Sequence, residues 1–212
     1  MKKQLFKLPF MLIVFTVLAL TSCKKEDTTD DSISAEDHSN VNTAMNSTTD
    51  DVTNSAAGVH NLSGKTEDVA ALCGATIDTT NASSGVLVIT FNGNDCSGKV
   101  SRTGSITATL ENYASGTRWK DAGAVLDLTF NNVKVTNNVT GANVTLNGTH
   151  TITNVTGGLA WRIMDGLDVG TVQHRHTANN FSITFADGSQ RTWSVNRLRT
   201  WTNNGTVRTV SI

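Results

Sequence analysis

An arginine- and tryptophan-rich segment near the end of the sequence carries its most distinctive chemistry. Within residues 191–201, one parity holds three arginines and two tryptophans, which are Arg191, Trp193, Arg197, Arg199 and Trp201. In a regular strand, residues of one parity share one face. Guanidinium groups bind oxyanions and indole rings stack, so such a face suits anionic glycans or phosphorylated lipid headgroups. We take it as the candidate ligand-binding site. Alternatively, a bulge shifts the register, burying the rings beneath arginine stems.

Two histidines suggest metal chemistry but lack an evident third ligand. His174 and His176 are two residues apart, so both point to one face of a strand. A metal site needs at least one more ligand, which only tertiary contact with His150 or Asp168 could supply. A pair of part-buried or surface histidines is the interpretation that we favour over a metal site. We therefore assign no metal and no cofactor.

The sequence contains no recognisable catalytic set. No serine lies in a Gly-x-Ser-x-Gly turn, and no phosphate-binding glycine loop is present. Acidic pairs exist, Asp165 with Asp168 and Glu111 with Asp121, but a glycosidase needs two carboxylates facing each other across a cleft. We assign no catalytic residue and predict a protein without enzymatic activity. A glycan-active hydrolase accessory or an envelope glycosidase is the alternative.

The N-terminus has the pattern of an export signal. Lysines at positions 2 and 3 precede an apolar run over residues 8–20, which is too short to span a bilayer. Leu20-Thr21-Ser22-Cys23 resembles the lipobox of bacterial lipoproteins. The resemblance implies that residues 1–22 are a signal peptide and that Cys23 is lipidated, which would anchor the chain in a membrane.

The residues after Cys23 are polar and acidic. Residues 23–33 lack apolar periodicity, so we expect a solvated tether. Lys24 fits outer-membrane sorting by analogy with enteric lipoproteins, and Cys-Lys-Lys-Glu-Asp resembles a surface-export signal of Bacteroidota lipoproteins. These resemblances imply an outer-membrane lipoprotein exposed at the cell surface.

Composition narrows the remaining questions. With 17 basic and 18 acidic residues the chain is nearly neutral, so bulk charge argues against nucleic acid as a partner. Besides Cys23, only Cys73 and Cys96 remain. In an oxidising compartment they can form a disulfide, which we expect to stabilise the fold by about 3 kcal/mol; free buried thiols are the alternative.

Apolar periodicity divides the rest of the chain into a helix and strands. Val41, Met45, Val52 and Ala56 fall on one helical face, so we expect an amphipathic helix over residues 34–58, ended by Gly58. From residue 69 the period changes to two, with apolar residues opposite hydroxyl-bearing ones. Expected strands cover 87–91, 106–110, 126–130, 144–152 and 181–185. Expected breaks fall at 92–93, 98, 131–132, 137–138, 157–158 and 187–188.

The pattern predicts a mainly β fold of eight or nine antiparallel strands over residues 69–212. Either a β-sandwich or a strongly curled antiparallel sheet fits it. The segments Leu87-Val-Ile-Thr-Phe91, Asp121 to Asn132 and Gly148 to Asn154 resemble uncharacterised Bacteroidota lipoproteins over about residues 73–201. That family has no assigned activity, so the resemblance implies a fold and a location only.

Together these observations predict a lipid-anchored envelope protein whose β domain has a binding or structural role. Glycans and lipopolysaccharide are the expected ligands, and the membrane is a partner through the lipid. Assembly through pairing of sheet edges is a further alternative. The ligand and the oligomeric state are not specified by the sequence.

Overall fold

The computed structural model describes residues 28–63 and 72–212 of the chain. The expected signal peptide, Cys23 and the first residues of the expected tether lie outside the described residues, as do residues 69–71 of the expected β domain.

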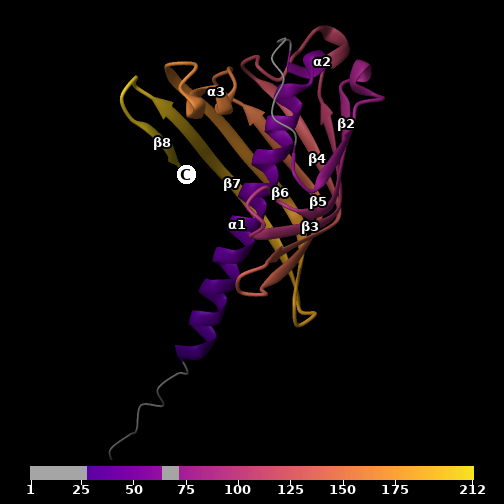
Figure 1. Ribbon diagram of the computed structural model, residues 1–212, viewed down its shortest axis with the longest axis vertical. Coiled ribbons are helices and arrows are strands. Elements are labelled where there is room, and N and C mark those ends of the chain that lie inside the picture. The colour runs from indigo at the N-terminus through magenta and orange to yellow at the C-terminus, as the bar shows by residue number, and fades with distance from the viewer. Residues whose placement is uncertain (1–27, 64–71) are drawn as a thin grey trace, which may run out of the picture.

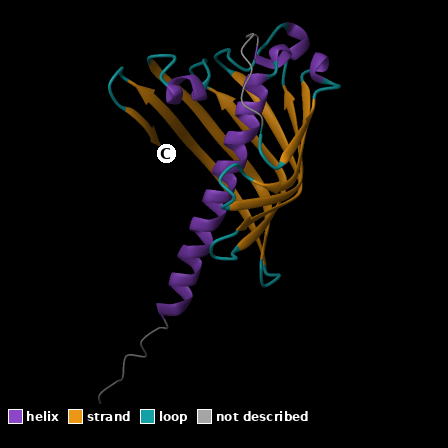
Figure 2. Cartoon of the chain, in the orientation of Figure 1, coloured by secondary structure: helices purple, strands orange, loops and turns teal. Residues whose placement is uncertain are grey.

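Eight antiparallel strands form one sheet, which confirms the prediction of a mainly β fold. The strands are β1 (Ala75–Asp78), β2 (Val86–Asn94), β3 (Val100–Leu110), β4 (Ala124–Asn137), β5 (Asn143–Asn154), β6 (Gly170–Phe185), β7 (Gln190–Asn203) and β8 (Arg208–Ser211). Their order in the sheet is their order in the sequence, so β1 and β8 are its edges. Of the two expected architectures, the curled sheet is the one observed, because a single layer bends around a helix (Figure 2).

A long helix, α1 (Thr28–Gly58), crosses the concave face of the sheet (Figure 1). It ends at Gly58 as expected but begins six residues before position 34, so its first turns occupy part of the expected tether. The short helix α2 (His60–Ser63) follows.

A line of bulges across the sheet produces its curl. Register shifts occur at Gly104 in β3, at 131–132 in β4, near Gly148 in β5 and at 179–180 in β6. Gly104, Asn132, Gly148 and Asn180 have positive φ values, which bulges of this kind require. Because bulges in neighbouring strands lie side by side, the sheet bends there and closes around α1.

Aromatic rings occupy the inside of this bend. Phe91 lies opposite Gly104 and Phe130 lies opposite Gly148 in the strand register. The rings of Phe130 and Phe181 meet edge to face, with centroids 5.1 Å apart. Both are fully buried with Met45 of α1, so helix and sheet share one core.

Two of the expected breaks are strand interior. Asn92 and Gly93 belong to β2, and Asn131–Asn132 is the bulge inside β4. The prediction of turns there was wrong. At Asn132 the reason is that asparagine adopts positive φ in bulges as readily as in turns, whereas Asn92 and Gly93 have no positive φ and continue the strand. The expected hairpin at 187–188 is confirmed: Gly188 has φ +84°, and the Phe185 amide donates to the Ser189 carbonyl between β6 and β7.

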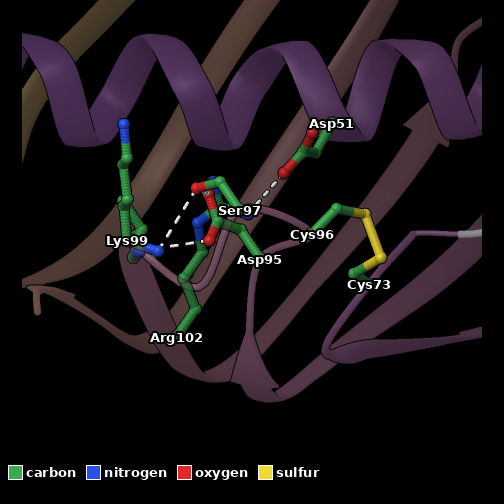
Figure 3. The surroundings of a disulfide bond; sticks show 8 residues. Asp51, Cys73, Asp95, Cys96, Ser97, Lys99 and Arg102 are labelled. Atoms are coloured by element: carbon green, nitrogen blue, oxygen red, sulfur yellow. Dashed lines mark hydrogen bonds and ion pairs between the residues drawn. A yellow bond between two sulfur atoms is a disulfide. The ribbon is translucent and has the colours of Figure 1, made fainter.

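The predicted disulfide joins Cys73 and Cys96, whose Cα atoms are 5.1 Å apart (Figure 3). It ties the start of β1 to the β2–β3 turn. In that turn Asp95 accepts hydrogen bonds from Ser97 Oγ and from the Val100 amide. Beside it, Arg102 of β3 reaches Asp51 of α1, so the crosslinked corner lies next to the helix.

Candidate functional site

All five residues of the candidate ligand-binding face lie on the inner side of β7. The bulge between β6 and β7 is in β6, so the alternation of β7 is unbroken from Trp193 to Trp201. The expectation of one shared face therefore holds for the backbone. That face is directed at α1, however, and Trp201 and Arg199 are only 5% exposed.

The arginines of this face bind α1. Arg199 makes a two-pronged ion pair with Asp50, with N–O distances of 2.7 and 3.1 Å. Arg197 donates to the side-chain oxygens of Asn42 and Asn46. At the far end Arg191, half exposed, lies 3.5 Å from the Asp37 carboxylate. With the Arg102–Asp51 pair, these contacts form a polar seam between helix and sheet, and we call them the α1 seam.

Three histidines lie on the inner face beside this seam. His150 of β5 and His176 of β6 are joined by a 3.1 Å contact between Nε2 and Nδ1, and both are buried. His174 is packed between Trp119 and Trp201, with ring centroids 5.0 and 4.7 Å away. Within the part of the chain that the structure describes, both ring nitrogens of His174 lack a hydrogen-bond partner.

Burial keeps these histidines neutral. Burial first, and then the adjacent guanidinium groups, lower the pKa of His150 to about 4 and that of His174 to about 3. The pKa of His176 is lowered still more, by burial first and then by His150 and the two arginines. Charged imidazole is disfavoured here because it would lose water and face existing positive charge.

Tertiary contact brings His150 close to His176, as a metal site at His174 and His176 would require of a third ligand. Asp168, the other ligand considered, does not join them. It pairs with Arg162, with an Nε–Oδ2 distance of 2.7 Å. No group of three or more histidine, cysteine or acidic side chains within residues 28–63 and 72–212 has a geometry that could hold a metal ion. The nearby arginines also disfavour a cation.

A cleft lies at one side of α1. It has a volume of about 480 Å³ and opens between α1, β7, β8 and α3 (Ala160–Asp165). Figure 1 shows α3 and α1 over the same side of the sheet, near β7 and β8. The residues that line the cleft are Asp50, Thr53, Asn54, Ala160, Trp161, Met164, Asp165, Arg199, Trp201 and Val210. We call it the α1–α3 cleft.

The cleft combines aromatic surface with hydrogen-bonding groups. The side chain of Asp50 is 40% exposed, while the side chain of its partner Arg199 is only 6% exposed. The carboxylate is therefore the accessible member of the pair. Arg199 also lies over the Trp201 ring, 4.7 Å from its centroid. The accessible polar groups are therefore the carboxylates of Asp50 and Asp165 and the amide of Asn54, rather than free guanidinium groups. Such a lining suits a ligand with many hydroxyl groups.

No protein-family model matches the chain, and neither a curated protein nor a solved structure matches it. The fold itself therefore defines the class: a consecutive antiparallel sheet curled around its own N-terminal helix. None of the helices in the described segments is long and apolar enough to cross a membrane.

Sequence reasoning identified part of this cleft. Arg199 and Trp201 were in the predicted set, and Asp165 was considered as a carboxylate. Asp50, Asn54 and Trp161 were missed. They lie on α1 and α3, up to 149 residues away from their β7 neighbours, and no local spacing in the sequence connects them.

Proposed function

We propose that this chain is a lipid-anchored outer-membrane protein whose non-enzymatic β domain binds a glycan in the α1–α3 cleft. The lining of the cleft carries this proposal. Trp161 offers ring surface for the apolar face of a sugar, while Asp50, Asn54 and Asp165 offer partners for hydroxyl groups.

A neutral glycan fits better than the anionic ligands expected from the sequence. Arg197 and Arg199 are satisfied by Asn42, Asn46 and Asp50 of α1, so binding a phosphate or carboxylate would break existing contacts. The two carboxylates in the cleft would also repel an anion. Lipopolysaccharide phosphates are for this reason less suitable partners than uncharged polysaccharide.

Substitution of Trp161 tests the cleft directly. Trp161→Ala removes stacking surface from α3, and we expect about tenfold weaker glycan binding, which corresponds to about 1.4 kcal/mol. Glycan-array screening of the full-length protein would identify the ligand, and calorimetry would give its affinity. Arg191→Ala, at the opposite end of β7, is the matched control and should leave binding unchanged. Equal losses in both variants would reject the cleft as the site.

The cleft also supports the alternative of a hydrolase, because two carboxylates, those of Asp50 and Asp165, line it. A glycosidase would release reducing ends from any glycan that the array identifies, and Asp165→Asn would abolish that release. Binding without turnover by the unmodified protein supports the non-enzymatic proposal instead.

The proposed anchor is supported by the lipobox-like residues and by the position of α1. Figure 1 shows that α1 projects beyond the sheet at its N-terminal end. Its 31 residues correspond to about 46 Å at the helical rise. A helix in this position can hold the β domain away from a bilayer.

Metabolic labelling with a fatty acid tests the anchor. We expect the label on the unmodified protein and none on Cys23→Ser, because the thiol is the acceptor for the lipid. Proteinase treatment of intact cells then decides on which side of the outer membrane the domain lies. Labelling that persists in Cys23→Ser would contradict the proposal.

A further inference from the structure

The buried histidines occupy an unusual place, next to the contacts that hold α1 on the sheet. A helix in a conventional core is held by apolar packing. α1 combines apolar packing with the polar contacts of the α1 seam; its residues in the core are Val41, Ala44, Met45, Val52, Ala56 and Ala57. Titratable groups face this interface from every element packed there: Asp37, Asp50 and Asp51 of α1, Asp95 of the β2–β3 turn, Arg102 of β3, His150 of β5, His174 and His176 of β6, and Arg191, Arg197 and Arg199 of β7.

We propose that α1 is an acid-released latch, in which protonation of His150, His174 and His176 detaches the helix from the inner face of the sheet. Each histidine is at most 1% exposed when α1 is in place. Removing α1 would open the inner face to water, where a charged imidazole can be hydrated. The released form therefore takes up protons that the docked form excludes.

The direction of the effect follows from proton linkage. A histidine has a pKa near 6.5 in water, whereas burial lowers the pKa of His150 to about 4 in the docked state. Between these values, each histidine that gains a proton on release favours release by about tenfold per pH unit. The docked state is thus favoured above pH 6.5, and release is promoted as the pH falls toward 4.

Asp51 does not drive the release. Burial raises the pKa of Asp51 above its ordinary value, more strongly than Arg102 lowers it. Protonation of Asp51 therefore stabilises the docked form and opposes release. Three histidines act against this single group, and in the released form, exposed to water, they gain protons near pH 6.5, so acidification first weakens the interface.

The residues of α1 make it a helix that depends on docking. Residues 42–55 are dominated by Ser, Thr, Asn and Asp, which compete for backbone hydrogen bonds and form isolated helices poorly. Four of these side chains already bond back to carbonyls three or four residues earlier, as in the 2.7 Å bond from Ser55 Oγ to the Asp51 carbonyl. Release should therefore unfold α1 and also expose the candidate ligand-binding face of β7.

Hydrogen exchange with mass spectrometry on the full-length protein, corrected for the intrinsic pH dependence of exchange, tests the latch. We expect peptides covering residues 41–57 to lose protection between pH 6.5 and pH 4, while peptides in β3, β4 and β5 stay protected. Simultaneous loss in helix and sheet would overturn the proposal, and so would an α1 that stays protected throughout.

The titrating groups are tested by His150→Gln/His176→Gln, which keeps polar side chains but removes two proton sites. We expect the release midpoint of this variant to fall by at least about one pH unit. His38→Gln removes an exposed histidine of α1 outside the cluster and should titrate like the unmodified protein. An unchanged midpoint in the double variant would reject the histidines as the trigger. If the double variant does not fold, the comparison of helix and sheet in the unmodified protein still decides whether the latch exists.

Discussion

Asn154 shows how a single buried amide can hold several backbone segments. It is fully buried at the end of β5, and its Nδ2 donates to the carbonyls of Trp119 and Gly158, both at 2.8 Å. Its Oδ1 accepts the Gly157 amide at 3.0 Å. Because Trp119 in turn donates its amide to Leu62, one side chain connects the loops near α2 and α3.

Asn154→Ala should be among the most damaging polar substitutions in the protein. It leaves three backbone groups without partners in a buried site, and we expect the free energy of unfolding to fall by about 3 kcal/mol. Urea unfolding followed by circular dichroism measures the change. Asn196→Ala removes an exposed amide on β7 and should change stability by less than about 0.5 kcal/mol. Similar losses in the two variants would contradict the role given to Asn154.

At the same scale, the Arg/Trp residues show what local sequence can and cannot predict. Alternation placed Arg197 and Trp201 on one side of a strand, and the structure confirms this. What covers that side depends on Asn46 and Asp50, about 150 residues earlier in the chain. Residues that pair across such a separation show no periodic pattern in the sequence, so the α1 seam could not be predicted. The alternative of a bulge within this segment did not apply, because the register shift is in β6.

Among the elements, the bulged strands determine the shape of the sheet. Alternation predicted most strands, and the disulfide corner followed from cysteine pairing. The choice between a sandwich and a curled sheet could not be made, because both require the same alternation. The decisive features are single residues with positive φ, such as Asn132, and their sequence signal is the same as that of a turn.

Gly104→Ala tests the importance of the bend. Gly104 has φ +97°, and a Cβ there would lie 2.3 Å from the Asn132 carbonyl oxygen of the neighbouring strand. We expect a loss of about 3 kcal/mol in unfolding free energy, because the backbone of β3 or β4 must move. Gly93→Ala is the control: its φ is not positive, and the nearest atom to the added carbon is 3.5 Å away. Thermal unfolding of both variants gives the comparison, and a tolerated Gly104→Ala would show that the bend adapts.

For the molecule as a whole, the neutral histidines predict a stability that depends on pH. The unfolded chain protonates each histidine near pH 6.5, whereas the folded protein with α1 docked excludes those protons until about pH 4 for His150 and about pH 3 for His174. Their contribution is complete above pH 6.5 and is lost as the pH falls. Each histidine should reduce the unfolding free energy by up to about 1.4 kcal/mol per pH unit between pH 6 and pH 4.

Urea unfolding at pH 7.5, 6.0 and 5.0 checks this dependence. The denaturant midpoint should decrease steadily below pH 6.5 in the unmodified protein and in His38→Gln, since His38 is exposed. It should decrease less in His150→Gln/His176→Gln. A midpoint that is flat between pH 7.5 and 5.0 would show that the histidines are hydrated in the folded state.

The consecutive strand order has a consequence for how the chain is assembled over time. Each hairpin can form from residues close in sequence, so the sheet can grow strand by strand from β1. α1 precedes all of these strands, yet its partners Arg197 and Arg199 belong to β7. Although α1 is the first described segment of the chain, it is therefore the last to dock on the sheet. During synthesis, the α1 region therefore lacks its β7 partners, and is weakly helical, until β7 has emerged. A chain interrupted before β7 could form hairpins but could not complete the α1 seam.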